Sequence, residues 1–519
     1  ETRYFGLPGG WQLFGPGEPS DQIYFVLSGS LGAFRIGANG KMELLGHIRA
    51  GEPVGEMSMI AGEAHENAVF ALRDTELLSM SRQGFMSLVK TDPQILERLT
   101  RVIMIRMRQA RKKTGRSAEP RVFGLVAASP TIDLKQRART LSTELQGMGM
   151  RVAIVGEEAV GMPAAYFDEL EMRNDIVLLL TLGDTPWFKM TQRHSDRIWL
   201  FARADARPSK PLLPDDPSPA RQFRLVDLVL LHHGGERQVT STAEWMDAAE
   251  ATRVFHWNQM DENDARRLSR TMSGKSVGLV LSGGGARAYA HIGVMRALRE
   301  ANCPVDFIGG ASMGAIVGAA IACGWDDEEI HRRIYQAFVE TNPLSDYRLP
   351  VVGLVKGHKV DARLKEHFGD RLIEDLPIPF FAVSTNLTQG TFKVHTQGLL
   401  REALRATILP PVVSSRQVLV DGAVLNNFPV DVMREAHRGR IIGVDVAAAP
   451  EGLSADDFIN PPGFFGWTLK HGFKTAPPIA NLLMRAATIS INPNQHRAIT
   501  DILIAPELAG IELRDWKEY

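Results

Sequence analysis

Residues 1 to about 90 alternate apolar and polar positions in short runs. Glycines separate these runs at close intervals between Gly15 and Gly55. A period of two predicts strands, and turn residues this regular predict a small β-roll or barrel. From Thr91 to Arg111 the apolar positions recur with a helical period instead. We therefore expect residues 1–117 to form an N-terminal β-roll with a C-terminal helix, followed by a basic linker.

Residues 118–265 alternate apolar strand-like runs with helical patterns. This alternation predicts an α/β domain with a mainly parallel sheet. The runs cover residues 122–127, 134–148, 151–155, 175–181, 198–202 and 225–231. The first turn, Ala127–Thr131, lacks the glycines and lysine of a phosphate-binding loop. We expect a Rossmann-like intermediate domain without nucleotide chemistry.

Residues 266–519 continue the α/β pattern and contain one distinctive stretch, Gly278–Gly318. An apolar run there ends in three consecutive glycines, and a helical pattern follows. A second apolar run, Val305–Ile308, leads into the sequence Gly-Ala-Ser-Met-Gly and another helical pattern. The order is strand, glycine loop, helix, strand, tight turn and helix. Further strands are expected at 380–384, 417–420 and 441–446, and helices at 328–339 and 360–368.

The composition is that of an ordinary globular protein. The 519 residues are 44% hydrophobic and 23% charged, with a formal net charge of -1, so we expect no nucleic-acid partner. The two cysteines, Cys303 and Cys323, have no metal-ligand spacing and favour a reducing, cytoplasmic compartment. No apolar run approaches the ~18 residues that span a bilayer. The start of the chain has no signal-peptide organisation and resembles a cut end, with a segment missing before it.

The tight turn and the glycine triplet predict acyl transfer by a serine. Gly310 and Gly314 flank Ser312 in a G-x-S-x-G pattern, where glycines let the chain turn sharply enough to expose the hydroxyl. Backbone N–H groups without a neighbouring Cβ can approach a developing oxyanion closely. The triplet that offers them is Gly283, Gly284 and Gly285.

Asp421 is the base that we expect to activate this serine. It lies at the end of an apolar run and is followed directly by glycine, so its carboxylate can face a cleft at the sheet edge. Burial raises the pKa of a carboxyl group, which lets it accept a proton from a hydroxyl near neutral pH. Taken alone, Asp-Gly is also a common turn pair.

A Ser-His-Asp triad is the rival arrangement. In the α/β-hydrolase order the histidine follows the aspartate, and the candidates are His437, His471 and His496. None stands beside a predicted strand end, so we expect each of them on the solvated surface. Asp445 is expected to cap a loop rather than to act as a second base.

Residues 276–450 resemble the patatin-like phospholipase family in the blocks GGGARA, GASMG and DGA. The resemblance implies a central, mainly parallel sheet with helices on both faces, and a Ser-Asp dyad of Ser312 and Asp421. It also implies an oxyanion hole from the glycine triplet, with Arg287 as the basic residue of that loop. The family usually closes the loop with glycine, whereas this chain has Ala288, whose methyl group reduces backbone freedom.

The N-terminal region resembles the cyclic-nucleotide-binding fold in LFGPGEPSDQIYFVLSGSLGAF and GEMSMIAGEAHENAV. In that family the second stretch is a phosphate cassette, and Gly55 and Glu56 match the residues that hold the ribose. Glu66 stands where an arginine would pair with the cyclic phosphate, and a carboxylate there repels phosphate. We expect a structural or regulatory module that binds no cyclic nucleotide tightly.

The domain order is similar to that of the neuropathy-target-esterase-like subgroup of the patatin-like family. The middle domain matches that subgroup in DTPWFKMTQRHSD and VLLHHGGERQVTSTAEWM, so the resemblance spans almost the whole chain. It implies hydrolysis of the acyl esters of phospholipids or lysophospholipids, with release of fatty acid and without a metal or other cofactor.

Three alternatives stay open at this point. The segment Pro461–Met484 combines aromatic residues with lysines, which suits peripheral contact with a membrane, but it also suits a helix over an acyl groove or a dimer contact. The chain could be a cyclic-nucleotide-responsive regulatory protein with a weak or vestigial hydrolase. It could also be a lipid acyltransferase that uses the same dyad, because the two reactions differ only in whether water reaches the acyl-enzyme.

Overall fold

The structure is a computed structural model of the chain. It describes residues 2–36, 42–111, 120–162, 164–183, 185–208, 226–234, 241–341, 357–408, 411–437, 439–446, 493–508, 510–511, 515–517 and 519. The chain divides into two compact units, Glu1–Gly274 and Lys275–Tyr519, and each is described by itself.

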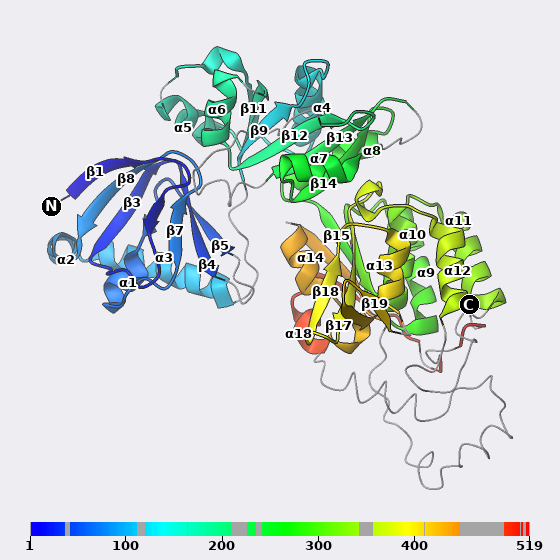
Figure 1. The fold of residues 1–519 in the computed structure, drawn as a ribbon. Helices are drawn as coiled ribbons and strands as arrows, with labels where there is room; N and C mark the ends of the chain where they lie inside the picture. The colour runs from blue at the N-terminus through cyan, green and yellow to red at the C-terminus, as the bar shows by residue number, and fades with distance from the viewer. Residues whose placement is uncertain are drawn as a thin grey trace, which may run out of the picture. The chain divides into compact units, whose positions relative to one another are not determined.

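The first part of unit one consists of two antiparallel four-stranded sheets, in blue in Figure 1. Their strand orders are β1-β8-β3-β6 and β2-β7-β4-β5. The strands are β1 (Thr2–Leu7), β2 (Gln12–Phe14), β3 (Gln22–Ser28), β4 (Ser30–Ile36), β5 (Met42–Arg49), β6 (Pro53–Val54), β7 (Ala68–Ala71) and β8 (Thr75–Ser81). Val26 and Leu77 of one sheet and Leu31 and Val69 of the other share one buried core.

Three helices complete this part, namely α1 (Glu56–Ala61), α2 (Arg82–Thr91) and α3 (Gln94–Arg111). The helical segment expected over Thr91–Arg111 is thus α3, which begins three residues later, and a separate helix, α2, precedes it. The break falls at Pro93, which has no N–H to continue the hydrogen-bond ladder of α2. The Asp92 carboxylate then accepts a 3.0 Å hydrogen bond from the Gln94 amide at the start of α3.

The second part of unit one is a six-stranded parallel sheet with the order β10-β11-β9-β12-β13-β14. Its strands are β9 (Val122–Ala127), β10 (Val152–Val155), β11 (Ile176–Leu182), β12 (Arg197–Arg203), β13 (Val226–His232) and β14 (Arg253–Asn258). Its helices are α4 (Leu134–Gly147), η1 (Glu157–Ala159), α5 (Ala164–Arg173), α6 (Pro186–His194), α7 (Thr242–Ala249) and α8 (Glu262–Met272). Every residue of β9 and β13 is buried, as expected for strands covered on both faces.

This strand order departs from the expected Rossmann-like arrangement. In the usual dinucleotide-binding sheet the second strand lies beside the first. Here β11 lies beside β9, and β10 is the edge strand. With four residues, three of them at least partly exposed, β10 is suited to an edge.

The boundary between the intermediate region and the last region also falls later than expected. Unit one ends at Gly274 rather than at residue 265, because α8 packs against α4 and β14. An ion pair of 3.6 Å between Arg266 and Glu144 joins α8 to α4.

Unit two is built on an eight-stranded sheet. Seven strands follow the order β19-β20-β17-β16-β15-β21-β22, and β18 pairs with β17. The strands are β15 (Val277–Leu281), β16 (Phe307–Ala311), β17 (Phe380–Asn386), β18 (Thr391–His395), β19 (Val412–Ser414), β20 (Gln417–Asp421), β21 (Arg440–Val444) and β22 (Ile502–Ile504). The pairings among β17, β16, β15, β21 and β22 are parallel, whereas those of β18, β19 and β20 are antiparallel.

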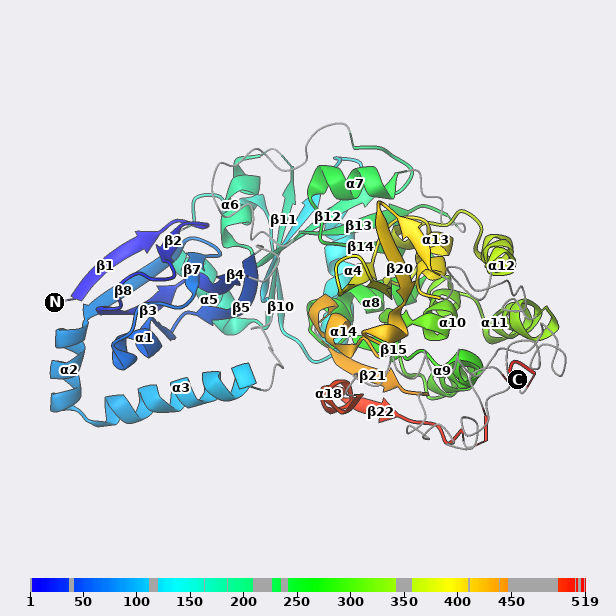
Figure 2. The same ribbon diagram turned by 60° about the horizontal axis from the view of Figure 1, so that its bottom comes forward.

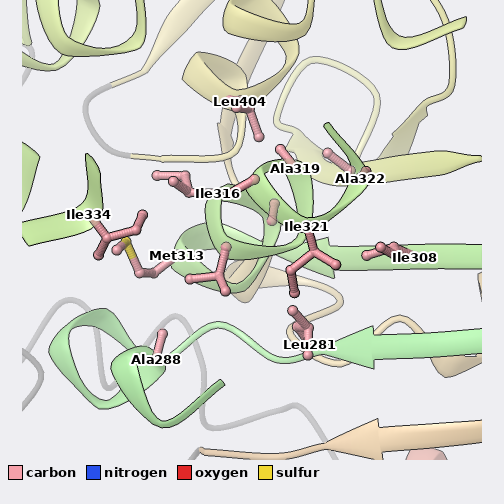
Figure 3. Close-up of a cluster of buried hydrophobic side chains, with 14 of the residues drawn as sticks. Leu281, Ala288, Ile308, Met313, Ile316, Ala319, Ile321, Ala322, Ile334 and Leu404 are labelled. Carbon is pink, nitrogen blue, oxygen red and sulfur yellow. The ribbon is translucent and has the colours of Figure 1, made fainter. Parts of the chain in front are cut away.

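Helices cover both faces of this sheet. They are α9 (Ala290–Glu300), α10 (Ser312–Ala322), α11 (Asp327–Ile334), α12 (His358–Phe368), α13 (Leu400–Ala406), α14 (Val430–Ala436) and α18 (Pro493–Ala498), with short turns η3 (Gly285–Tyr289), η4 (Tyr335–Glu340, a π-helix), η5 (Ile373–Asp375) and η6 (Gly422–Val424). Figures 1 and 2 show α9 and α10 on one side of β15 and α14 on the other. The side chains of α10 gather with Leu281, Ile308 and Leu404 in the core (Figure 3).

A buried ionic cluster crosses the parallel sheet of unit one. Asp227 of β13 is fully buried, and its carboxylate accepts hydrogen bonds from the guanidinium groups of Arg197 and Arg253 on the two neighbouring strands. These two cations hold the pKa of Asp227 far below its ordinary value. The carboxylate therefore stays ionised, and its removal would leave a buried positive charge without compensation.

We predict that Asp227→Ala lowers the free energy of unfolding of unit one by about 3–5 kcal/mol, the usual cost of breaking a buried ion pair. Urea denaturation followed by the fluorescence of the buried Trp199 and Trp257 measures this change. Asp205→Ala is the matched control, because its ion pair with Arg203 is exposed and worth less than about 1 kcal/mol. Equal effects of the two variants would contradict the prediction.

Candidate active site

Ser312 is the first residue of α10 and follows β16 directly. Its φ is 51°, a left-handed backbone conformation that residues other than glycine seldom adopt. Such strain persists only where the surrounding structure enforces it, and a nucleophilic serine between a strand and a helix is a recurrent case. The backbone therefore supports Ser312 as the central residue of a nucleophile elbow.

The two flanking glycines serve a different purpose from the one expected. Neither Gly310 nor Gly314 has a positive φ, so the sharp turn is made by Ser312 itself. Both are required by close backbone packing instead. A Cβ on Gly314 would lie 2.4 Å from the Ser282 carbonyl oxygen, and one on Gly310 would lie 2.8 Å from the Gly314 carbonyl carbon.

Asp421 is the last residue of β20 and lies beside the serine. The Ser312 hydroxyl donates a 2.8 Å hydrogen bond to Asp421 Oδ2, and Oδ1 accepts a 2.9 Å bond from the Ala423 amide. The carboxylate is buried, and this burial raises its pKa to about 6 although both hydrogen bonds oppose the rise. A carboxylate with this pKa is mostly ionised at neutral pH and is still basic enough to take a proton.

Within the described residues, no histidine hydrogen-bonds to Ser312 or Asp421. His471 lies outside those residues, and His496 Nδ1 is 2.7 Å from the Phe428 carbonyl oxygen. His395 Nε2 lies 2.7 Å from the hydroxyl of Ser384, which pairs with Asp421 across the strands. Burial lowers the pKa of His395 to about 4, so its ring is neutral at neutral pH.

The expectation that His437 is solvated was wrong. This residue is 3% exposed, and its ring stacks on Phe307 with centroids 5.1 Å apart. It fills the space that Gly278 leaves on the sheet, where a Cβ would lie 2.3 Å from His437 Nε2. Phe307 is the first residue of β16, whereas Ser312 follows the last one. His437, which stacks on Phe307, therefore lies at the opposite end of this strand from the serine.

The glycine triplet lies between β15 and η3, next to the serine. Gly285 has a φ of 54°, which a side chain would disfavour, and a Cβ on Gly283 would lie 2.9 Å from Ser312 Cβ. Ala288 is fully buried in η3 with no positive φ, so its methyl group fits the loop without strain. The Arg287 Nε donates a 2.5 Å hydrogen bond to the Ile511 carbonyl, which fixes this guanidinium against the C-terminal segment.

Three residues that sequence reasoning missed hold this loop in place. The His291 Nε2 donates a 2.9 Å hydrogen bond to the Ser282 carbonyl, and burial lowers the pKa of His291 to about 4. The Ser282 hydroxyl accepts a 2.9 Å bond from the Val446 amide. Asn427 bonds to both backbone groups of Gly283. The one signal for Asn427 was its place, six residues after Asp421 in a polar Asn-Asn pair.

Asp445 has a structural partner, as expected for a residue outside the dyad. Its carboxylate forms a 2.6 Å ion pair with Arg497 of α18. This contact joins the loop after β21 to the last helix.

The predicted cassette residues Glu56 and Glu66 differ in solvent exposure. Gly55 has a φ of 83° before α1, and Glu56 is buried at 2% exposure. Glu66 is exposed. That Glu66 takes the place of the phosphate-binding arginine stays a prediction.

Two family models match the chain. The patatin-like phospholipase model matches residues 279–434, and the cyclic nucleotide-binding domain model matches residues 7–92. An NTE family protein of Mycobacterium tuberculosis is 31% identical over 549 residues, which cover 99% of this chain and 88% of that protein. The chain belongs to the NTE family. At the level of the family it is a patatin-like lipid hydrolase with an N-terminal cyclic nucleotide-binding domain.

Other relatives of this family are longer proteins. Patatin-like phospholipase domain-containing protein 7 of Rattus norvegicus is 27% identical over 85% of this chain, and lysophospholipase NTE1 of Phaeosphaeria nodorum is 26% identical over 93% of it. The aligned part makes up 38% of each of these two relatives. A cyclic nucleotide-binding domain from Methylobacillus flagellatus is 25% identical over 22% of this chain and 65% of its own, with a TM-score of 0.21.

The structure bears differently on the predictions about membrane contact and about metal binding. The segment Pro461–Met484 lies outside the described residues, so its membrane contact stays a prediction. In the described part of the chain, no helix is both long and apolar enough to cross a bilayer. In the same part, no group of three or more His, Cys, Asp or Glu side chains could hold a metal ion.

We predict that Asp421→Asn stabilises the protein at pH 7.5. A folded-state pKa of about 6 against 3.8 means that ionised Asp421 costs up to about 3 kcal/mol of folding free energy. This cost is complete above pH 6, decreases as the pH falls and disappears below pH 4, where both states are protonated. The neutral amide avoids it, so the Tm of the variant should exceed that of the wild type at pH 7.5 and equal it near pH 4. A lower Tm of the variant at pH 7.5 would show that the carboxylate is not destabilising.

Proposed function

We propose that the chain is a serine esterase that hydrolyses the acyl esters of phospholipids or lysophospholipids with Ser312 and Asp421 as a catalytic dyad. One observation carries this proposal, the 2.8 Å hydrogen bond from a serine in a left-handed elbow to a buried carboxylate whose pKa is raised. The glycine loop beside the serine supports the same chemistry.

In the acylation step, the Ser312 oxygen attacks the ester carbonyl while Asp421 accepts the hydroxyl proton. The carbonyl π electrons move to oxygen, and amides of the glycine loop stabilise the resulting negative charge. One such donor is typically worth about 3–4 kcal/mol. The C–O bond to the glycerol oxygen then breaks, and Asp421 returns the proton to that leaving oxygen.

In the deacylation step, water attacks the acyl-serine carbonyl and gives its proton to Asp421. The bond from the acyl carbon to the Ser312 oxygen breaks, and the serine takes the proton back. The product is a free fatty acid. The same base serves both steps, as the single carboxylate beside Ser312 requires.

An apolar pocket lined in part by the helix that begins at Ser312 supports a substrate with a hydrocarbon chain. It lies between α10, α11, η4 and α12, and its lining includes Ile316, Ile334, Ala337, Phe338 and Leu364. Ile316 follows Ser312 by four residues, so it lies on the same helix face, about 6 Å along the axis. Its side chain leans toward the N-terminus and so toward the serine.

The names of the relatives support the same substrate class. The relatives from Rattus norvegicus and Phaeosphaeria nodorum carry the names phospholipase and lysophospholipase. The acyl ester is the group common to both substrates, and an apolar pocket suits the hydrocarbon chain of such an ester. For the N-terminal domain we propose a role without tight binding of cyclic nucleotides, because Glu66 replaces the expected arginine.

We predict that Ser312→Ala and Asp421→Asn each lower kcat/KM for a lysophospholipid at least about 1000-fold, since each removes one half of a cooperating pair. For the wild type, log kcat/KM should rise with pH up to about 6 and level off above, because Asp421 acts only when ionised. Released fatty acid measured from pH 4.5 to 8.5 tests both statements. A profile that is flat across pH 6, or an active Asp421→Asn variant, would rule out the carboxylate as the base.

We predict that Ala337→Leu shifts the chain-length preference. A larger side chain in the pocket should lower kcat/KM for a 16-carbon acyl chain about 10-fold more than for an 8-carbon chain, since one methylene gained or lost in a hydrophobic pocket is worth about 1–3 kcal/mol. Ala403→Leu in α13 adds the same volume to the same core outside the pocket and should leave the preference unchanged. An identical chain-length profile in all three proteins would show that the acyl chain binds elsewhere.

A further inference from the structure

Asn427 forms hydrogen bonds with both the amide and the carbonyl of Gly283, the first glycine of the triplet. The Gly283 amide donates a 3.1 Å hydrogen bond to the backbone carbonyl of Asn427. The side-chain Nδ2 of Asn427 donates a second one, also 3.1 Å, to the Gly283 carbonyl. Because the Gly283 amide is engaged in this way, it does not face a substrate oxygen. Two contacts therefore connect the glycine loop to the segment that begins at Asp421.

The orientation of the Asn427 amide follows from its partner. A carbonyl oxygen accepts hydrogen bonds only, so the side-chain atom that faces it is the nitrogen. The side-chain oxygen, Oδ1, is buried and has no hydrogen-bond donor in the part of the chain that the structure describes. A Cβ on Gly283 would lie 2.4 Å from this oxygen. The amide group thus packs directly against the glycine.

Peptide geometry carries this contact to the next residue. The Gly283 carbonyl and the Gly284 amide belong to one planar trans peptide and point in opposite directions. The hydrogen bond from Asn427 to the carbonyl therefore sets the direction of the Gly284 N–H. The preceding peptide is also held, because the Ser282 carbonyl accepts from His291 and the Gly283 amide donates to Asn427.

Gly284 and Gly285 are the remaining donors of the triplet. Among the described residues, no acceptor is recorded for the amide of either one, and their loop lies beside Ser312. We propose that Asn427 is a positioning residue that aims the Gly284 amide at the oxyanion of the reacting ester. This inference rests on the proposed esterase function. It assigns no contact between Asn427 and the substrate.

Substituting the side chain tests this role because the backbone bond from Gly283 to residue 427 is kept. In Asn427→Ala the bond to the Gly283 carbonyl is lost, and in Asn427→Asp a carboxylate oxygen replaces the donor at nearly the same size. Asn426→Ala is the matched control. Asn426 is buried, and its amide bonds to Asp431 within its own segment instead of to the loop.

The readout compares a p-nitrophenyl ester with its thiono analogue, in which sulfur replaces the carbonyl oxygen. Sulfur accepts hydrogen bonds weakly, so the thionoester gains little from the loop amides. Both Asn427 variants should lower kcat/KM for the oxygen ester about 10- to 100-fold, less than the loss of a whole oxyanion donor. The thionoester rate should change less than about threefold, and Asn426→Ala should leave the ratio of the two rates unchanged.

Hydrogen exchange of the 281–287 segment provides a measurement that does not depend on activity. The Gly283 amide exchanges only when the loop opens away from residue 427, and the lost side-chain bond is one of the two that keep it closed. Asn427→Ala should therefore exchange this amide at least about 10-fold faster than the wild type, and Asn426→Ala should not. Unchanged exchange, or an equal loss of both ester rates, overturns the positioning role. An inactive wild type, or a Ser312→Ala variant as active as the wild type, overturns the esterase proposal instead and leaves the exchange result to decide the role of Asn427.

Discussion

The close approach of two backbones, at the end of β15 and at the first turn of α10, is the constraint on which the site depends. Gly314 lies against the carbonyl groups of Leu281 and Ser282, where a Cβ would be 2.5 and 2.4 Å from the two oxygens. Only glycine permits this contact. With α10 pressed against the strand end, the chain has no room for a gradual turn after β16, and Ser312 takes up the strain in its own backbone. The same contact brings the serine next to the glycine triplet.

The site is maintained at a cost in stability. A left-handed serine costs about 1–3 kcal/mol, and the buried carboxylate of Asp421 adds a desolvation penalty that its two hydrogen bonds only partly offset. Both residues lie on the edge of a large core, in which α10 is buried along its whole length. Side chains packed to this density resist the local rearrangements that would relieve the strain. The residues that destabilise the fold are thus those that the proposed chemistry needs, and the surrounding core offsets their cost.

Patterns confined to a few neighbouring residues were readable from the sequence, and those that depend on distant partners were not. The strand and helix runs, the elbow and the Asp-Gly pair each follow from local periodicity or turn chemistry. The order of β10 and β11 does not, because both strands are apolar and only their lengths and exposure separate an edge from an interior position. His437 was misjudged for the same reason. Its neighbours in sequence are polar, whereas its surroundings are set by Gly278, 159 residues earlier in the chain.

Asn427 shows what fixes the distance between the proposed base and the glycine loop in this fold. Asp421 and Asn427 stand at the two ends of one seven-residue segment that contains the short helix η6. One end of the segment holds the serine hydroxyl, and the other holds the Gly283 peptide. The relative position of base and loop is therefore set by local backbone geometry rather than by the packing of distant helices. Helices that line the apolar pocket can then differ in sequence without moving the proposed base or the glycine loop.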